Sequence, residues 1–321
     1  MRLYAYEDRH GEPRIGALTA KGLLTGSRLD RVTRGPSLLT WQSICCLVND
    51  PAWAGSFGSL IRRARRRGAS AMDPERRRPL PAIAHGKIIC VGLNYGDHAR
   101  EGGRAVPDRP MLFSKFANAI VGDGEAIVRP EGTRALDLEV ELGVVIGAPA
   151  RRVKPDQAMN HVAGYVVVND VSARDWQGNP QALREGEKGD GQWLRAKGSD
   201  TFLPVGPVFV TTDELDPRDG LAVRSWRIPA SGEGAGTPVL MQDGNTADML
   251  HDVPALVSFV SRYVTLQPGD LIATGTPAGV GVFRDPPVFL EPGDRVRCEI
   301  EGIGVVENPI VDWTEDPRPA P

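Results

Sequence analysis

The chain has 321 residues, 41% of them hydrophobic, and a formal net charge of −3. These values predict a globular protein with a sizeable core, in one large domain or two smaller ones, and argue against nucleic acid or an anionic membrane as a partner. No run approaches the length of a membrane span and the N-terminus lacks the apolar core of a signal peptide, so we expect a cytoplasmic location.

Residues 1–80 are expected to form a small N-terminal domain that ends in a basic linker. Residues 2–30 read as short strands around a turn at residues 10–13, and helical stretches follow. Eight arginines crowd the segment between Arg62 and Arg78. They could form a basic patch for nucleic acid or an acidic partner, but the run has no interleaved aromatic residues, which favours a solvated helix end and linker.

Residues 81–321 are expected to form the larger domain, in which strands dominate and the fold class is α+β, predominantly β. Pro-Gly-Asp triplets at 268–270 and 292–294 suit tight turns that enter strands. Polar and apolar residues alternate throughout 295–301, which predicts a half-buried antiparallel strand. Residues 162–168 are apolar throughout, which predicts a strand covered on both faces. The four cysteines lack zinc or disulfide spacing and are interpreted as reduced structural thiols: Cys45, Cys46, Cys90 and Cys298.

His98 and Glu101 follow the apolar segment 88–91. If they lie on a short helix, their separation puts them on one face, where the carboxylate can orient the imidazole and raise its basicity. The pair is a candidate general base, and a surface ion pair is the alternative. Glycines 102 and 103 follow directly, so the segment could move as a lid.

Glu139, Glu141 and Asp170 form a candidate metal site. Residues two apart on a strand point to one face about 7 Å apart, and like charges held that close raise one another's pKa. No basic residue lies within the segment, so a cation would neutralise the pair. Oxygen ligands without a His or Cys cluster favour Mg²⁺, with Mn²⁺ or Ca²⁺ as substitutes. The alternative is an edge strand with a solvated acidic face.

Further candidates follow these carboxylates in the chain. A fixed Arg or Lys beside a metal, such as Arg174 or Lys197, can hold a substrate carboxylate or stabilise an oxyanion, although either could be a structural ion-pair partner. Gly275 and Thr276 lie in a segment with hydroxyls and free backbone N–H groups suited to a carboxylate. That segment fits neither the phosphate-loop nor the dinucleotide-binding pattern.

Together these motifs resemble the fumarylacetoacetate hydrolase superfamily, in its acylpyruvase and 2-hydroxyhepta-2,4-diene-1,7-dioate isomerase-like bacterial branch. The matching blocks are 91–101, 139–141, 169–177, Lys197 and 269–277. The resemblance implies a mixed β-roll catalytic domain after a smaller N-terminal domain, usually assembled as a homodimer. It also implies a lid and a magnesium-dependent substrate site, with His98 and Glu101 on the lid, the metal at Glu139, Glu141 and Asp170, and substrate contacts from Arg174, Gln177 and Lys197.

The expected reaction is hydrolysis of a carbon–carbon bond in an acylpyruvate-like 2,4-dioxo or 2-oxo acid, by way of an enolate that the cation stabilises. His98, oriented by Glu101, would deprotonate the attacking water, and Lys197 with Gln177 would stabilise the oxyanion. Decarboxylation of a 2-oxo diacid and keto–enol isomerisation are the alternatives, and a catalytically silent metal-binding protein is less expected. Residues 227–238 replace a short hairpin common in relatives, and the sequence assigns them no role.

Overall fold

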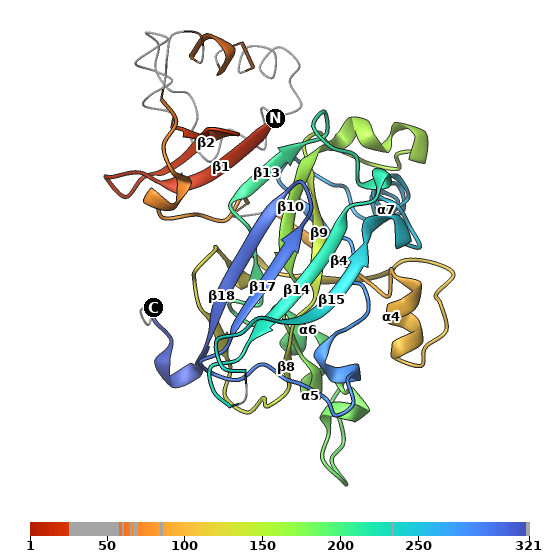
Figure 1. The fold of residues 1–321 in the computed structure, drawn as a ribbon. Helices are drawn as coiled ribbons and strands as arrows, with labels where there is room; N and C mark the ends of the chain where they lie inside the picture. Colours follow the sequence, from red (N-terminus) through yellow and green to blue (C-terminus); the bar gives the residue numbers. More distant parts are fainter. Residues whose placement is uncertain are drawn as a thin grey trace.

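The computed structural model describes residues 1–25, 58–59, 61–64, 66, 70–83, 86–232 and 234–318. Two large sheets packed face to face form the body of this part of the chain (Figure 1). Within the described residues, the larger sheet has nine strands in the order β3-β2-β1-β13-β10-β9-β16-β4-β5, and the smaller has five in the order β15-β14-β17-β18-β7. Strands β16 and β4 pair in parallel while their neighbours pair antiparallel, so the larger sheet is mixed.

The strands of the nine-stranded sheet are β1 (Arg2–Glu7), β2 (Pro13–Thr19), β3 (Gly22–Leu24), β4 (Ile88–Gly92), β5 (Met111–Lys115), β9 (Val140–Ile146), β10 (Val162–Asn169), β13 (Val208–Thr211) and β16 (Leu271–Ala273). Those of the five-stranded sheet are β7 (Ile127–Arg129), β14 (Ala222–Ile228), β15 (Val239–Asn245), β17 (Arg295–Ile300) and β18 (Gly304–Asp312). Two short pairs join β8 (Leu136–Asp137) to β11 (Ser172–Ala173) and β6 (Ile120–Val121) to β12 (Leu203–Pro204). The helices include α4 (Gly96–Glu101), α5 (Arg174–Gln177), α6 (Trp193–Gly198), α7 (Val253–Ser261) and the 3-10 helix η3 (Pro155–His161).

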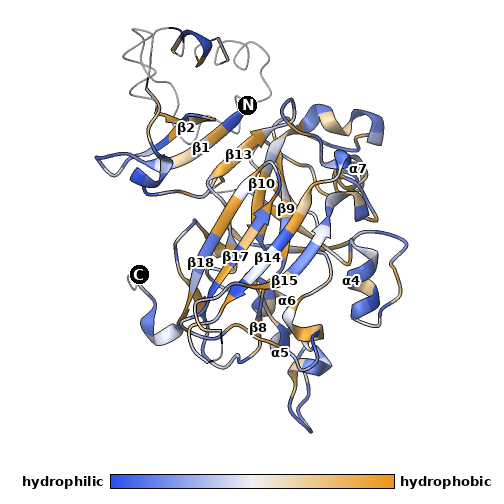
Figure 2. Ribbon diagram, viewed as in Figure 1, coloured by the Kyte–Doolittle hydropathy of each residue, from blue (hydrophilic) through white to orange (hydrophobic). Residues whose placement is uncertain are grey.

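Strands β9 and β10 form the centre of the larger sheet, and every residue in both is buried. Their apolar character stands out in Figure 2, and β10 packs against β17 and β18 of the second sheet. The prediction that residues 162–168 form a strand covered on both faces is therefore confirmed. Strand β9 lies between β10 and β16, so the alternative of a solvated edge strand at Glu141 is wrong.

Several other strands form where the sequence predicts them. Residues 295–300 form β17 with the predicted alternation of burial, and both Pro-Gly-Asp triplets lead into strands. The predicted strands around residues 10–13 are β1 and β2, and β1 pairs with β13, so these strands extend the larger sheet. The predicted domain boundary near Leu80 remains a prediction. Cys90 and Cys298 are buried free thiols, while Cys45 and Cys46 lie outside the described residues.

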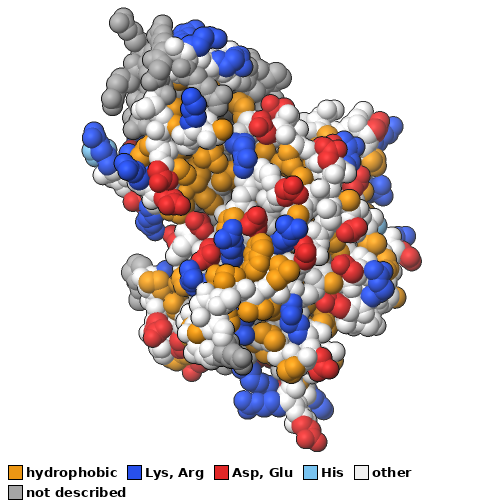
Figure 3. Space-filling model, in the orientation of Figure 1, with side chains coloured by type: hydrophobic (Ala, Val, Ile, Leu, Met, Phe, Trp, Pro, Cys, Tyr) orange, Lys and Arg blue, Asp and Glu red, His pale blue; other side chains and the backbone are white. Residues whose placement is uncertain are grey.

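The basic run is described only in part. Arg62, Arg63 and Arg66 are exposed, and Arg78 forms ion pairs with Glu7 and Glu125, which ties the end of the run to the body. The rest of the predicted helical stretch lies largely outside the described residues. On the face drawn in Figure 3, basic and acidic side chains are interspersed. In the part of the chain that the structure describes, no helix is both long and apolar enough to span a membrane.

Candidate active site

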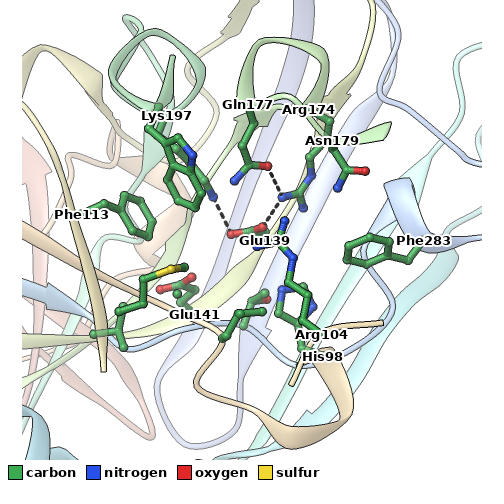
Figure 4. Close-up of a pocket in the computed structure, with 16 residues that line it drawn as sticks. His98, Arg104, Phe113, Glu139, Glu141, Arg174, Gln177, Asn179, Lys197 and Phe283 are labelled. Atoms are coloured by element: carbon green, nitrogen blue, oxygen red, sulfur yellow. Dashed lines mark hydrogen bonds and ion pairs between the residues drawn. The ribbon is translucent and has the colours of Figure 1, made fainter. Parts of the chain in front are cut away.

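A small pocket opens where β4, β9, α4, α5 and α6 meet, and its cavity has a volume of about 40 Å³ (Figure 4). Seven of the ten site residues expected from the sequence line it: His98, Glu139, Glu141, Arg174, Gln177, Lys197 and Thr276. The other three form hydrogen bonds with residues of this group: Glu101 with His98, Asp170 with Lys197 and Gly275 with Glu141. The structure thus brings the whole predicted set together.

The carboxylates Glu139, Glu141 and Asp170 meet because of the register between β9 and β10. Val168 on β10 pairs with Glu141, and beyond the end of β10 the Asp170 N–H donates a 2.8 Å hydrogen bond to the Glu139 carbonyl. All three side chains are buried, and one oxygen from each lies within 4.8 Å of the others. Ligands 2.0–2.6 Å from a single ion are at most about 5 Å apart, so these oxygens can share one cation.

Basic side chains from two short helices reach the carboxylates. The Arg174 Nη1 atom lies 2.6 Å from Glu139 Oε1, and the Lys197 Nζ atom lies 2.7 Å from Glu139 Oε2 and 2.8 Å from Asp170 Oδ2. Burial alone would raise the pKa of Glu139, but Arg174 and Lys197 more than offset this and hold it well below its usual range. The same carboxylates raise the pKa of Lys197 against the effect of its burial.

Lys115, at the end of β5, is a third buried cation that the sequence analysis missed. It donates hydrogen bonds to the main-chain carbonyls of Val171, Lys197 and Phe202, and its Nζ lies 2.7 Å from Asp170 Oδ1 as an ion pair. Because the three N–H groups are used by carbonyls, Asp170 Oδ1 has no hydrogen-bond donor. A lysine closing an apolar strand was the only signal in the sequence.

Asp137, also missed, anchors Arg174. Its Oδ2 accepts a 2.9 Å hydrogen bond from Arg174 Nε, and its two oxygens also accept from the backbone N–H groups of Gly281 and Val282. The pairing of β8 with β11 sets this contact, because Ser172, just before α5, lies opposite Asp137. The alternation of acidic residues at 137, 139 and 141 could have identified it.

Charge balance in this cluster supports a bound cation. Ion pairs link six buried groups of alternating sign into a neutral chain: Asp137, Arg174, Glu139, Lys197, Asp170 and Lys115. Glu141 has no ion-pair partner among the described residues, and its pKa is raised well above the usual value by burial and by the charges of Asp170 and Glu139. A buried carboxylate without a cationic partner among the described residues, beside two other carboxylates, fits a hard divalent cation.

His98 lies across the pocket on α4, which forms where it was predicted. Its Nδ1 lies 2.7 Å from Glu101 Oε1, and Glu101 Oε2 accepts a 2.9 Å hydrogen bond from the Gly279 N–H. Since a carboxylate only accepts, the neutral ring carries its proton on Nδ1 and a lone pair on Nε2. His98 is 6% exposed, which excludes the alternative of a surface ion pair.

The Gly275-Thr276 segment also has protein partners. Gly275, at a φ of 97°, donates its N–H to Glu141 Oε2 at 2.8 Å, so the N–H that was expected to be free holds a carboxylate of the chain itself. The Thr276 hydroxyl donates to the Val140 carbonyl and accepts from Gln242 Nε2. Both groups therefore fix the position of β9 beside the pocket.

Arg174 retains one donor for a ligand. Its Nε and Nη1 bind Asp137, Glu139 and Gln177, whereas its buried Nη2 has no hydrogen-bond partner. A buried unsatisfied donor is costly, and here it belongs to a residue that lines the cavity. The Phe113 ring also lines the pocket, with its centroid 5.1 Å from Lys197 Nζ.

Known proteins resemble this chain in sequence and in fold. The model of the family described as fumarylacetoacetate (FAA) hydrolase C-terminal matches residues 87–311. A mitochondrial oxaloacetate tautomerase of Bos taurus is 48% identical over 231 residues, which are 72% of this chain and 68% of that protein. The structure of 2-hydroxyhepta-2,4-diene-1,7-dioate isomerase from Mycobacterium marinum is 32% identical, with a TM-score of 0.68, and the match covers 98% of this chain and 100% of that chain.

A third relative carries the family's own name. The structure of a fumarylacetoacetate hydrolase from Exiguobacterium antarcticum is 32% identical, with a TM-score of 0.70, and the match covers 97% of this chain and 99% of that chain. The resemblance inferred from the motifs is confirmed, and so is the predominantly β, α+β fold class. The chain belongs to the fumarylacetoacetate hydrolase family of enzymes.

Proposed function

We propose that this enzyme catalyses keto–enol tautomerisation of a 2-oxo acid, with Mg²⁺ as its cofactor. The observation that carries the proposal is a buried His98, paired with Glu101, in the same pocket as the Glu139, Glu141 and Asp170 cluster. A base opposite a cation site is what removal of a proton next to a carbonyl group requires.

Glu139, Glu141 and Asp170 would hold the cation, and an all-oxygen donor set favours Mg²⁺, with Mn²⁺ or Ca²⁺ as substitutes. When bound, the cation would act as a Lewis acid toward the 2-oxo group. Arg174 Nη2 is the free donor that would bind the substrate carboxylate, and Gln177 and Lys197 lie on the same side of the pocket.

His98 Nε2 would take a proton from the carbon next to the 2-oxo group. The C–H bond breaks and its electron pair forms the carbon–carbon double bond, while the carbonyl π pair moves to the 2-oxo oxygen, which gains a proton from solvent to give the enol. The His98 imidazolium then returns its proton to solvent. Ketonisation is the reverse, and no water is consumed. Glu101 stabilises the imidazolium that forms, because its Oε1 lies 2.7 Å from Nδ1.

One finding favours tautomerisation over the hydrolysis expected from the sequence. The Bos taurus relative, 48% identical over the matched region, is named an oxaloacetate tautomerase. Carbon–carbon bond hydrolysis remains the second candidate, since the same dyad could deprotonate water and one solved relative is named a fumarylacetoacetate hydrolase.

Product analysis separates these reactions. The purified chain would be given enol-oxaloacetate and, separately, an acylpyruvate, each with Mg²⁺ and with EDTA. Tautomerisation predicts Mg²⁺-dependent loss of the enol absorbance with no carbon dioxide and no cleavage products. Cleavage of the acylpyruvate to pyruvate would favour hydrolysis, and carbon dioxide release would favour the decarboxylase alternative. Turnover that survives EDTA would refute the metal-dependent mechanism.

The homodimer and the cytoplasmic location that were expected from the sequence remain predictions.

A further inference from the structure

Arg104 differs from the other two cations that line the pocket. Arg174 and Lys197 are buried and ion-paired with carboxylates, as described above. Arg104 is exposed, and among the described residues its guanidinium has no hydrogen-bond or ion-pair partner. A positive charge at the edge of a substrate pocket without a protein partner is available to a ligand.

The backbone holds Arg104 on the same segment as His98. Its N–H donates a 2.9 Å hydrogen bond to the Ala99 carbonyl, and the preceding Gly103 has a φ of 63°, which closes the C-terminal end of α4. Both His98 and Arg104 line the pocket, and Figure 4 draws them together on the side away from Phe113. Any movement of α4 would therefore carry the base and the free cation together.

The charge balance of the pocket leaves a role for this cation. The ion-paired chain of six residues from Asp137 to Lys115 has no net charge. A divalent cation bound beside the negative Glu141 would give the site one net positive charge. The substrate carboxylate next to the 2-oxo group would neutralise that charge. The Glu101 carboxylate is turned toward His98 and the Gly279 N–H instead of the cavity. Arg104 is then the one remaining unpaired charge among the described residues that line the pocket.

We infer that Arg104 binds a second carboxylate of the substrate, so that the enzyme selects 2-oxo dicarboxylic acids over monocarboxylic ones. This inference rests on the proposed function, which places the 2-oxo acid end at the carboxylate cluster. The other end of a short diacid then lies on the His98 side of the cavity, within the region that Arg104 lines. Binding there would also hold the carbon that loses its proton beside His98.

Two matched ligands test the inference without relying on turnover. Oxamate and N-oxalylglycine share the chelating oxalyl end, but only N-oxalylglycine carries a second carboxylate. Their affinities would be measured calorimetrically with Mg²⁺ for the wild type, Arg104→Gln and Arg104→Lys. Arg109→Gln is the control, because Arg109 is an exposed arginine of the same connecting segment that does not line this pocket.

We expect the wild type and Arg109→Gln to bind N-oxalylglycine about threefold to tenfold more tightly than oxamate, which is the range for one charge-assisted hydrogen-bonded pair at a partly exposed site. Arg104→Gln should lose this preference while its oxamate affinity stays unchanged, and Arg104→Lys should retain part of it. Equal affinities in the wild type, or a preference that survives Arg104→Gln, would overturn the inference and leave the proposed function standing. Failure of the wild type to bind either ligand would overturn both.

Discussion

Lys115 Nζ lies 2.7 Å from Asp170 Oδ1, and both side chains are completely buried. Burial lowers the pKa of Lys115, while Asp170 raises it and so favours the charged form. With its N–H groups bound to three main-chain carbonyls, the ammonium is a fixed part of the cluster. It orients the carboxylate that would bind the cation.

Lys115→Met is expected to reduce the free energy of unfolding by about 3–5 kcal/mol, because it breaks a buried ion pair to Asp170 and leaves three main-chain carbonyls without their donor. Urea denaturation monitored by circular dichroism would measure the change. Lys21→Met, at an exposed position, is the control and should stay within about 0.5 kcal/mol of the wild type. Equal stability of the two variants would mean that the Lys115–Asp170 pair does not support the fold.

Asp137→Asn should weaken substrate binding, since Asp137 holds Arg174 Nε at 2.9 Å. The amide group of Asn cannot accept from Arg174 and from both backbone N–H groups of Gly281 and Val282 at once. We expect kcat/KM to fall roughly 10- to 100-fold, mainly through KM. Steady-state kinetics would test this, with the exposed-pair variant Asp243→Asn as the control. An unchanged KM would show that Asp137 does not contribute to substrate binding.

Glu141→Gln should abolish tight Mg²⁺ binding without destabilising the metal-free protein. Glu141 is the carboxylate without a cationic partner among the described residues, and its charge is disfavoured by burial and by Asp170 and Glu139. A glutamine can still accept the Gly275 N–H. Calorimetric titration with Mg²⁺ and thermal unfolding in EDTA would provide the two readouts.

The exposed Glu315→Gln substitution is the control for that variant. Glu141→Gln should unfold in EDTA at the wild-type temperature or above it, because a repulsive buried charge has been removed. Mg²⁺ affinity equal to that of the wild type would show that the cation is held elsewhere.

Local patterns in the sequence predicted the parts of the site that depend on one element. The apolar run of β10 predicted a buried strand that presents Asp170, and the spacing of His98 and Glu101 predicted a pair on one face of a helix. The acidic alternation at Glu139 and Glu141 was enough to propose a cation site. Each of these follows from strand or helix periodicity alone.

The parts that were missed depend on contacts between distant elements. Lys115 ends β5 at one edge of the larger sheet, whereas Asp170 follows β10, four positions away in the strand order, and no local pattern reports their contact. The same limit applies to Gly275, whose N–H was expected to be free and instead binds Glu141. Whether a polar group faces a ligand or another part of the chain depends on sheet order and register, which periodicity does not specify.

In the proposed mechanism His98 is the base, and the carboxylate cluster separately holds the cation. The most direct test measures Mg²⁺ affinity and the rate of oxaloacetate tautomerisation for the wild type and His98→Ala in parallel. We expect His98→Ala to bind Mg²⁺ as tightly as the wild type but to tautomerise oxaloacetate at least about 100-fold more slowly. A variant that keeps the wild-type rate, or one that loses the rate only because it no longer binds Mg²⁺, would contradict this mechanism.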